Sequence, residues 1–244
     1  MFHYTPSEKI CIFIKDNTDS GGGGATTLPH NSVRIEISPY SFDYEFTHFG
    51  QQIQWLLSHE LVHIVTSDQY SKPVSGLRKL LGKIAPGKDE PFSVPFGILT
   101  NPYRFQPTWY HEGIAVFMET WENGGYGRVL GSFDEMYFRT LVEEGTPYPK
   151  KSRMDFMDDD SFLLGSTAYF YGARFTAWLT THYDLDRMLD FMTVNKNQSQ
   201  LHIHYKKEFK TLFGTSLDKA WKEFLAAETA FQKRTCNESI NTRN

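Results

Sequence analysis

Two histidines four residues apart, His59 and His63, have the residue type and the spacing to bind a metal ion. On an α-helix, residues four apart lie on one face about one turn from each other, so both imidazoles can bind a single ion through nitrogen at about 2 Å. Glu60 lies between them in sequence, and in this pattern its carboxylate reaches a water molecule on the metal rather than the metal itself. The pattern therefore indicates metal-assisted hydrolysis with Glu60 as general base.

A catalytic zinc site needs a third protein ligand, because zinc usually takes three and keeps the fourth position for water. Glu112 is the best candidate: it opens a second helix, in which Gly113 allows close packing against a neighbour. His111 is an alternative, but adjacent helix positions point about 100° apart, so only one of the two can face the metal. The non-functional alternatives are an ordinary amphipathic helix for the histidines and a surface carboxylate at a helix start for Glu112.

The two motifs together resemble those of the gluzincin metallopeptidases, which include the large zinc aminopeptidases. The second motif of that family reads Trp-x-x-Glu-Gly-x-Ala with a further Glu seven residues on, and this chain matches it with Trp109, Glu112, Gly113, Ala115 and Glu119. The resemblance implies one Zn²⁺ bound by His59, His63 and Glu112. It also implies that Glu119 is a carboxylate behind the ligands, one that orients a ligand histidine and most directly His59.

A third segment is similar to the Tyr-x-Lys-Gly segment of the zinc aminopeptidases, in which a tyrosine hydrogen-bonds the oxyanion of the tetrahedral intermediate. Tyr169 takes the tyrosine position, three residues before Gly172, and Tyr171 stands where that family has lysine. A neutral phenol at pH 7 can donate this hydrogen bond. The resemblance implies a catalytic Tyr169, whose alternative is a place in the core or at the cleft rim. An aspzincin pattern is rejected, because Ala168 stands where that family has its aspartate ligand.

Two departures from the large aminopeptidases bear on the expected activity. Forty-eight residues separate His63 from Glu112, whereas that family has a short connection. Its Gly-x-Met-Glu-Asn strand, which holds the free amino terminus of the substrate, would fall near Gly22–Pro29, where this chain has no glutamate. We therefore expect an endopeptidase. Two alternatives remain: a non-catalytic gluzincin-like binding or assembly module of a larger envelope protein, and a zinc hydrolase of non-peptide amides.

The elements that must position these residues begin with strands. Apolar and β-branched residues predict one strand over Lys9–Lys15, in which Cys11 is expected to be buried, and alternation with period two predicts another over Ser32–Ser38. The glycine run Gly21–Gly24 lies between them. It is interpreted as a flexible hairpin connection, or else as a backbone left bare so that a ligand can approach it.

Helical periodicity follows. A helix is expected from near Thr47 to Ile64, because apolar residues recur there at helical spacing. Six prolines between residues 66 and 107 predict an insertion, 67–107, with only short helical pieces. Further helices are expected at Trp109–Trp121, at Phe133–Glu144 and in a series that ends with Leu217–Phe231.

The expected fold class is α+β and zincin-like, with a small N-terminal β lobe and an active-site helix followed by a mostly helical C-terminal body. We expect one catalytic domain over residues 1–244. Its parts are a β lobe at 1–50, zinc-binding helices at 51–131, a helical lobe at 132–233 and a tail at 234–244.

Composition and charge exclude several classes of protein. Aromatic residues make up 16% of the chain, which excludes disorder. The net charge of −4 lacks the basic excess of a nucleic-acid binder, so nucleic acid is not an expected partner. The longest apolar runs, such as Ile114–Met118, fall far short of the roughly 18 residues that a membrane span needs. Two cysteines are too few for a disulfide framework.

The insertion has two interpretations. Leu77–Lys88 carries four basic residues among apolar ones and leads into the apolar stretch that ends at Leu99. It is either an interfacial segment that contacts an anionic membrane through residues 77–99, or a cover over the cleft that shapes substrate access.

The order of segments is similar to that of gluzincin-type catalytic domains in bacterial secreted or envelope proteins, some of which precede a β-propeller in a longer chain. The resemblance implies a peptide or protein substrate and a periplasmic or extracellular location. Because Met1–Pro6 contains no signal peptide, it also implies a chain excerpted from a longer protein.

Overall fold

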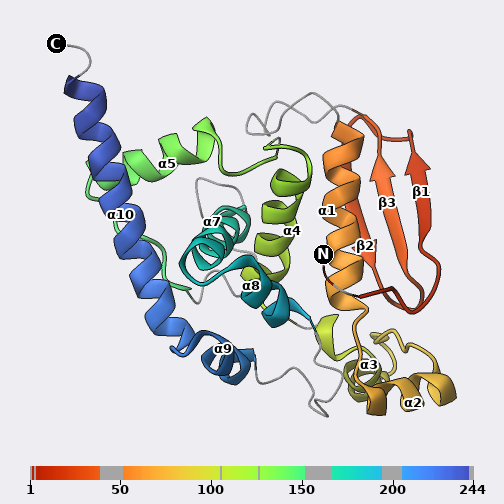
Figure 1. Cartoon of the computed structure of the whole chain (residues 1–244). Helices are drawn as coiled ribbons and strands as arrows, with labels where there is room; N and C mark the ends of the chain where they lie inside the picture. Colours follow the sequence, from red (N-terminus) through yellow and green to blue (C-terminus); the bar gives the residue numbers. More distant parts are fainter. Residues whose placement is uncertain are drawn as a thin grey trace.

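The computed structural model describes residues 2, 4–38, 52–104, 106–125, 127–151, 166–193 and 205–241. Within these residues the chain forms a three-stranded sheet and nine α-helices, which confirms the predicted α+β class (Figure 1). The strands are β1 (Cys11–Lys15), β2 (Gly22–Thr26) and β3 (Ser32–Glu36). The helices are α1 (Gln52–Ser67), α2 (Lys72–Leu81), α3 (Ser93–Thr100), α4 (Thr108–Glu122), α5 (Ser132–Glu143), α7 (Thr167–His182), α8 (Leu185–Met192), α9 (Tyr205–Phe213) and α10 (Leu217–Asn241), with a 3₁₀ turn η2 (Pro102–Arg104).

The sheet has the order β1-β3-β2, with β3 parallel to β1 and antiparallel to β2. The interpretation of the glycine run as a flexible connection is therefore wrong, since Gly22–Gly24 pair with β3 as part of β2. The physical reason is close packing: a Cβ added at Gly23 would lie 2.8 Å from both Leu56 Cδ1 and Glu60 Oε1. The bare backbone lets the strand approach α1 at the position of Glu60.

Helix α1 lies between the sheet and α4 (Figure 1). Its apolar side packs on β2 and β3, where Val33 and Ile35 are buried together with Trp55, Leu56 and Ile64. Helix α1 begins at Gln52 within the described part of the chain, and the predicted start near Thr47 lies outside the described residues.

Strand β1 differs from the expectation. Cys11 is exposed, and Ile12, Phe13 and Ile14 are 47%, 54% and 65% exposed. The prediction of a buried Cys11 is therefore wrong. The reason is position: α1 covers β2 and β3, while β1 lies at the far edge of the sheet (Figure 1).

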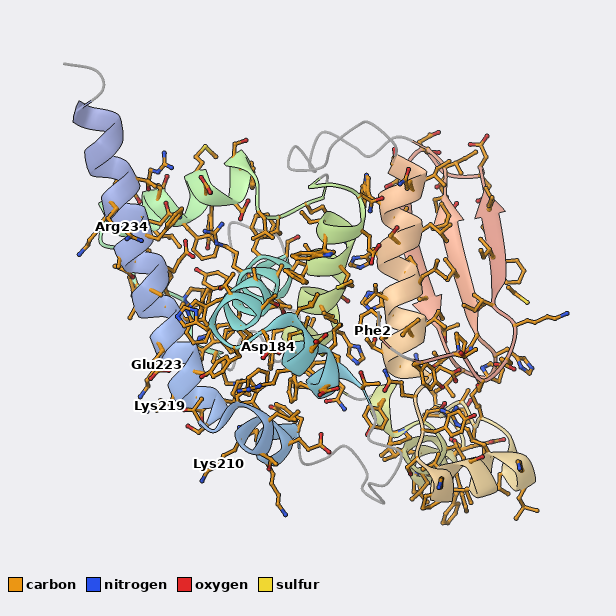
Figure 2. All side chains as sticks on the ribbon, viewed as in Figure 1. Phe2, Asp184, Lys210, Lys219, Glu223 and Arg234 are labelled. Carbon is orange, nitrogen blue, oxygen red and sulfur yellow. The ribbon has the colours of Figure 1, made fainter. Side chains whose placement is uncertain are left out.

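The helical body has its own core, built on the packing of α4 against α7. Aromatic rings dominate it: Trp109 lies edge-on to Phe175 at 5.6 Å between ring centroids, and Phe175 lies edge-on to Trp221 at 4.8 Å. Figure 2 shows side chains filling the space between α7 and α10. Much of the aromatic surplus in the composition is therefore packing between helices.

A buried ion network ties three helices of this body together. Arg174 of α7 donates to Asp134 of α5 at 2.5 Å and to Glu228 of α10 at 2.8 Å. Asp134 also accepts from the backbone amides of Leu130 and Gly131, at 3.2 and 2.7 Å. The network therefore holds the turn that precedes α5 as well as the helices themselves.

The predicted insertion consists of α2, α3 and η2, short helical pieces as expected. It is held to the end of α1 by Asp68, which is fully buried and accepts from Arg78 of α2 at 3.1 Å and from Lys83 at 3.2 Å. Arg78 also donates to the carbonyl oxygen of Thr100 at the end of α3. Within the described residues, no helix combines the length and the apolar character needed to span a membrane.

Candidate metal centre

Two neighbouring helices bring the predicted ligands together. Helix α1 carries His59 and His63 one turn apart, and Glu112 lies in the first turns of α4, which packs along α1. The two imidazole Nε2 atoms are 3.0 Å apart, and each lies 3.3 Å from Glu112 Oε2. Within the described residues, these three side chains form a group that could hold a metal ion.

The size of this triangle fits zinc. Ligand atoms bound at about 2.0–2.1 Å in tetrahedral geometry lie about 3.3 Å from one another. The observed separations of 3.0, 3.3 and 3.3 Å between the nitrogen and oxygen atoms are close to that value. Two imidazoles and one carboxylate are also a ligand set that zinc accepts at catalytic sites.

The surroundings of Glu112 suit a bound cation. Its Oε2 atom is buried and has no hydrogen-bond partner, although two ring nitrogens lie 3.3 Å away. Burial acts to raise the pKa of Glu112, but the neighbouring His63 and His59 outweigh it and hold this pKa well below its usual range. A charged carboxylate and two nitrogen lone pairs that converge on one point are best satisfied by a cation.

Glu119 lies two turns after Glu112 on α4 and is fully buried. Its Oε2 is 2.9 Å from His59 Nδ1, so the structure places it behind the histidine named from the sequence. When Nε2 of an imidazole binds a metal, Nδ1 carries the hydrogen and can donate it to this carboxylate. Burial opposes the charge of Glu119, yet Arg128 and His59 lower its pKa to about 2.

Arg128 was missed by sequence reasoning. Its side chain donates to both oxygens of Glu119, at 3.1 Å from Nε and 2.9 Å from Nη2, and its backbone amide donates to Oε1 at 2.9 Å. The guanidinium also lies 5.3 Å from the ring centroid of Trp55 and 5.2 Å from that of Tyr169. Arg128 therefore contacts side chains of α1, α4 and α7 beside the candidate metal ligands.

A local signal could have pointed to Arg128. The chain turns sharply at Gly124 and Gly125, both with positive φ, directly after the helix that carries Glu119. At Gly127 a Cβ would collide with Thr120 of that helix. A glycine-rich turn of this kind folds the next residue back along the helix, which brings Arg128 to Glu119.

The ligands open onto a cavity of about 370 Å³. Gly23, Gly24 and Ala25 of β2 line one side of it, and Thr108, His111 and Tyr169 line other parts of its wall. His111 is therefore at the cavity, but it is Glu112 that converges with the two histidines. The part of the cavity that borders β2 lies along the edge of the sheet.

Glu60 and Tyr169, the predicted catalytic pair, both line this cavity. Burial raises the pKa of the Glu60 carboxyl, against the effect of the neighbouring histidines. The Tyr169 ring stacks parallel to the His59 ring, with centroids 6.3 Å apart. Burial raises the pKa of Tyr169 above its ordinary value, so its phenol keeps its proton at neutral pH and can donate a hydrogen bond.

Gln106 is a second residue that sequence reasoning missed. It lines the cavity, and both its Nε2 and its Oε1 are buried without a hydrogen-bond partner. A side-chain amide offers one donor group and one acceptor, the same pair that a peptide unit offers. Gln106 could therefore bind the backbone of a substrate.

Comparison with known proteins adds no relative: no family model, no curated protein and no solved structure matches this chain.

Proposed function

We propose that this chain is a zinc-dependent peptidase with a zincin-like catalytic domain of the gluzincin type. The observation that carries the proposal is the triangle of His59 Nε2, His63 Nε2 and Glu112 Oε2, which opens onto the same cavity as Glu60. The buried contact of Glu119 with His59 supports it, because ligand histidines usually donate their other ring nitrogen to such a partner. We place the protein in the periplasm or outside the cell, on the resemblance alone.

His59, His63 and Glu112 would hold the zinc ion, which when bound supplies a Lewis acid for the substrate carbonyl and for the attacking water. Glu60 takes the proton from that water and passes it to the leaving amine. A carboxylate suits this task because burial raises its pKa towards neutral pH. Tyr169 donates a hydrogen bond to the oxygen of the carbonyl as negative charge develops on it.

A peptide is favoured over other amides by the surroundings of the site. Strand β2 is at an edge of the sheet and borders the cavity, so an extended chain can pair with it through backbone hydrogen bonds. Gln106 offers an unpaired amide to a further peptide unit. Strand β2 itself carries no carboxylate that would hold a free amino terminus, which favours cleavage within a chain.

The experiment that tests the proposal combines metal analysis with cleavage of internally quenched peptides whose termini are blocked. We expect one zinc per chain and cleavage that stops on addition of a chelator. Glu60→Gln should keep the zinc and lose at least about a hundredfold in kcat/KM, which is the low end of general-base contributions. The control is Glu122→Gln, on an exposed glutamate of α4, which should match the wild type.

Each proposal has its own failing result. A well-folded preparation that binds no zinc contradicts the metal centre. Stoichiometric zinc with no cleavage by either protein favours the non-catalytic binding module. Stoichiometric zinc with hydrolysis of small non-peptide amides but not of peptides favours the other hydrolase.

A further inference from the structure

The insertion between α1 and α4 exposes an unusual amount of apolar surface. The described residues include fourteen exposed large apolar side chains, and six of these lie between residues 80 and 99. They are Leu80, Leu81, Phe92, Val94, Phe96 and Leu99. Leu80 and Phe92 are 81% and 82% exposed, the highest values of the set. Leu80 and Leu81 end α2, and the other four lie in α3 or directly before it; α2 and α3 pack on each other, so both elements present apolar side chains to solvent.

Helix α2 is amphipathic but buries none of its residues. Helix α2 packs on α3, and Arg78 ties it to Asp68 after α1; together α2 and α3 lie at one end of the molecule, beside the sheet (Figure 1). Lys72 and Lys79 are seven residues apart and so lie on one side of α2. Helical spacing places Leu80 on the adjacent side. An amphipathic helix with this arrangement is suited to lie in the interface of a bilayer.

The charge of the insertion is opposite to that of the rest of the chain. Residues 71–100 contain five basic and two acidic side chains, whereas the remainder contains 20 basic and 27 acidic ones. Two of the five, Arg78 and Lys83, pair with Asp68, and Lys83 also pairs with Glu8. Lys72, Lys79 and Lys88 are exposed, with Asp89 and Glu90 beside the last of them.

A cavity of about 340 Å³ lies between α2 and the N-terminal segment, next to this surface. Arg78, Lys79, Lys83 and His30 line it, with Glu8 as its only lining carboxylate among the described residues. Basic groups beside exposed apolar side chains match a lipid surface, in which acidic head groups lie above hydrocarbon.

Hydrogen bonds and ion pairs hold the insertion to the rest of the protein. Arg78 bonds Asp68 and the carbonyl of Thr100 at once, which ties both helices of the insertion to the end of α1. This buried ion network therefore fixes α2 and the end of α3 relative to α1.

We propose that residues 72–99 bind the surface of an anionic bilayer, with Leu80 and Phe92 inserted into the interface and the exposed lysines near the lipid head groups. The protein is then peripheral to the membrane. The proposal does not depend on zinc or on peptidase activity.

The test is co-sedimentation of the full chain with vesicles of phosphatidylcholine, with and without phosphatidylglycerol. We expect binding to the mixed vesicles that is at least about tenfold tighter than to phosphatidylcholine alone and that weakens as salt is added. Replacing both Leu80 and Phe92 by serine should weaken binding at least about tenfold, because both side chains lose their burial in lipid. Lys72→Glu with Lys79→Glu should remove the preference for phosphatidylglycerol.

The matched control is Phe13→Ser, on an aromatic side chain of β1 that is 54% exposed and lies outside the insertion. It should bind vesicles as the wild type does. The proposal is overturned if the wild type binds neither kind of vesicle, or if Phe13→Ser weakens binding as much as the double variant. It is also overturned if the wild type forms a dimer that the Leu80 and Phe92 replacements dissociate, because the surface then joins two copies.

Discussion

Gly113 and Gly172 face each other where α4 meets α7, and neither can be replaced without moving a backbone. A Cβ at Gly113 would lie 2.5 Å from the carbonyl carbon of Gly172, and a Cβ at Gly172 would collide with the carbonyl oxygen of Trp109. The contact brings together Glu112, which adjoins the first glycine, and Tyr169, one turn before the second. The proposed metal ligand Glu112 and the proposed oxyanion donor Tyr169 therefore line one cavity, because α4 and α7 touch through these glycines.

Gly113→Ala should destabilise the protein by roughly 1–3 kcal/mol, the usual cost of overpacking. It should also weaken zinc binding, because α4 must move and carries Glu112 with it. The measurement is urea unfolding together with zinc affinity. The control is Gly76→Ala in α2, where a Cβ meets nothing within 4 Å, and it should be neutral or slightly stabilising. Equal stabilities for the two variants would contradict the assigned role of the contact.

Arg128→Lys tests whether the guanidinium positions His59, a proposed metal ligand, both directly and through Glu119. The guanidinium of Arg128 is planar, so it bonds both oxygens of Glu119 and also lies over the rings of Trp55 and Tyr169. Lysine keeps the positive charge but cannot make both kinds of contact at once. We expect zinc affinity to fall by about 10- to 100-fold, as for other partners of ligand histidines. Competition with a chromophoric chelator measures it. Arg187→Lys, on an arginine that is 44% exposed, is the control.

Glu119 predicts a specific dependence of stability on pH. Its pKa is about 2 in the folded chain and near 4.5 in an ordinary carboxyl. Its contribution to the free energy of unfolding is therefore fully present above about pH 4.5. That contribution is lost as the pH falls towards 2. Glu119→Gln should therefore be less stable than the wild type at neutral pH, and the difference should narrow in acid. Urea unfolding in the presence of a chelator measures it, and a difference that stays constant with pH would contradict the assignment.

Gly23→Ala tests the close approach of β2 to the proposed general base. The added methyl group would lie 2.8 Å from Glu60 Oε1, so the carboxylate must move. We expect peptide cleavage to fall roughly a hundredfold while zinc stays bound, because Glu60 is not among the proposed metal ligands. Gly22→Ala, whose Cβ would meet nothing within 4 Å, should keep its activity. Loss of zinc from Gly23→Ala would indicate a wider disturbance of α1.

Periodicity and spacing were informative where one element decides the outcome. The pair His59 and His63 could be placed on one helix face from the sequence alone, and short helices were expected in the insertion because of its prolines. The position of Glu112 opposite them depends on the packing of α4 along α1, which the sequence indicated only through the resemblance. The histidine spacing and the short helices are local features of the sequence, and the proposed role of Glu112 follows from a known family motif.

The rest depended on contacts between segments that are distant in sequence. Arg128 belongs to the site only because the turn after α4 folds back on Glu119. The glycine run forms a strand only because β3 pairs with it and α1 packs on it. Cys11 lies in an apolar run and is exposed all the same, since α1 covers the other two strands. No pattern within one segment reports which neighbour will cover it.

The ion network of Arg174 sets a limit on how far the chain can be shortened from its C-terminal end. Glu228 of α10 accepts a hydrogen bond from Arg174. Gln232, in the next turn of the same helix, also donates to Glu228, at 2.8 Å. Arg174 also bonds Asp134, which accepts from the backbone amides of Leu130 and Gly131 shortly after Arg128. A protein cut before Glu228 would keep every proposed metal ligand and yet leave the buried guanidinium of Arg174 without one of its two carboxylate partners.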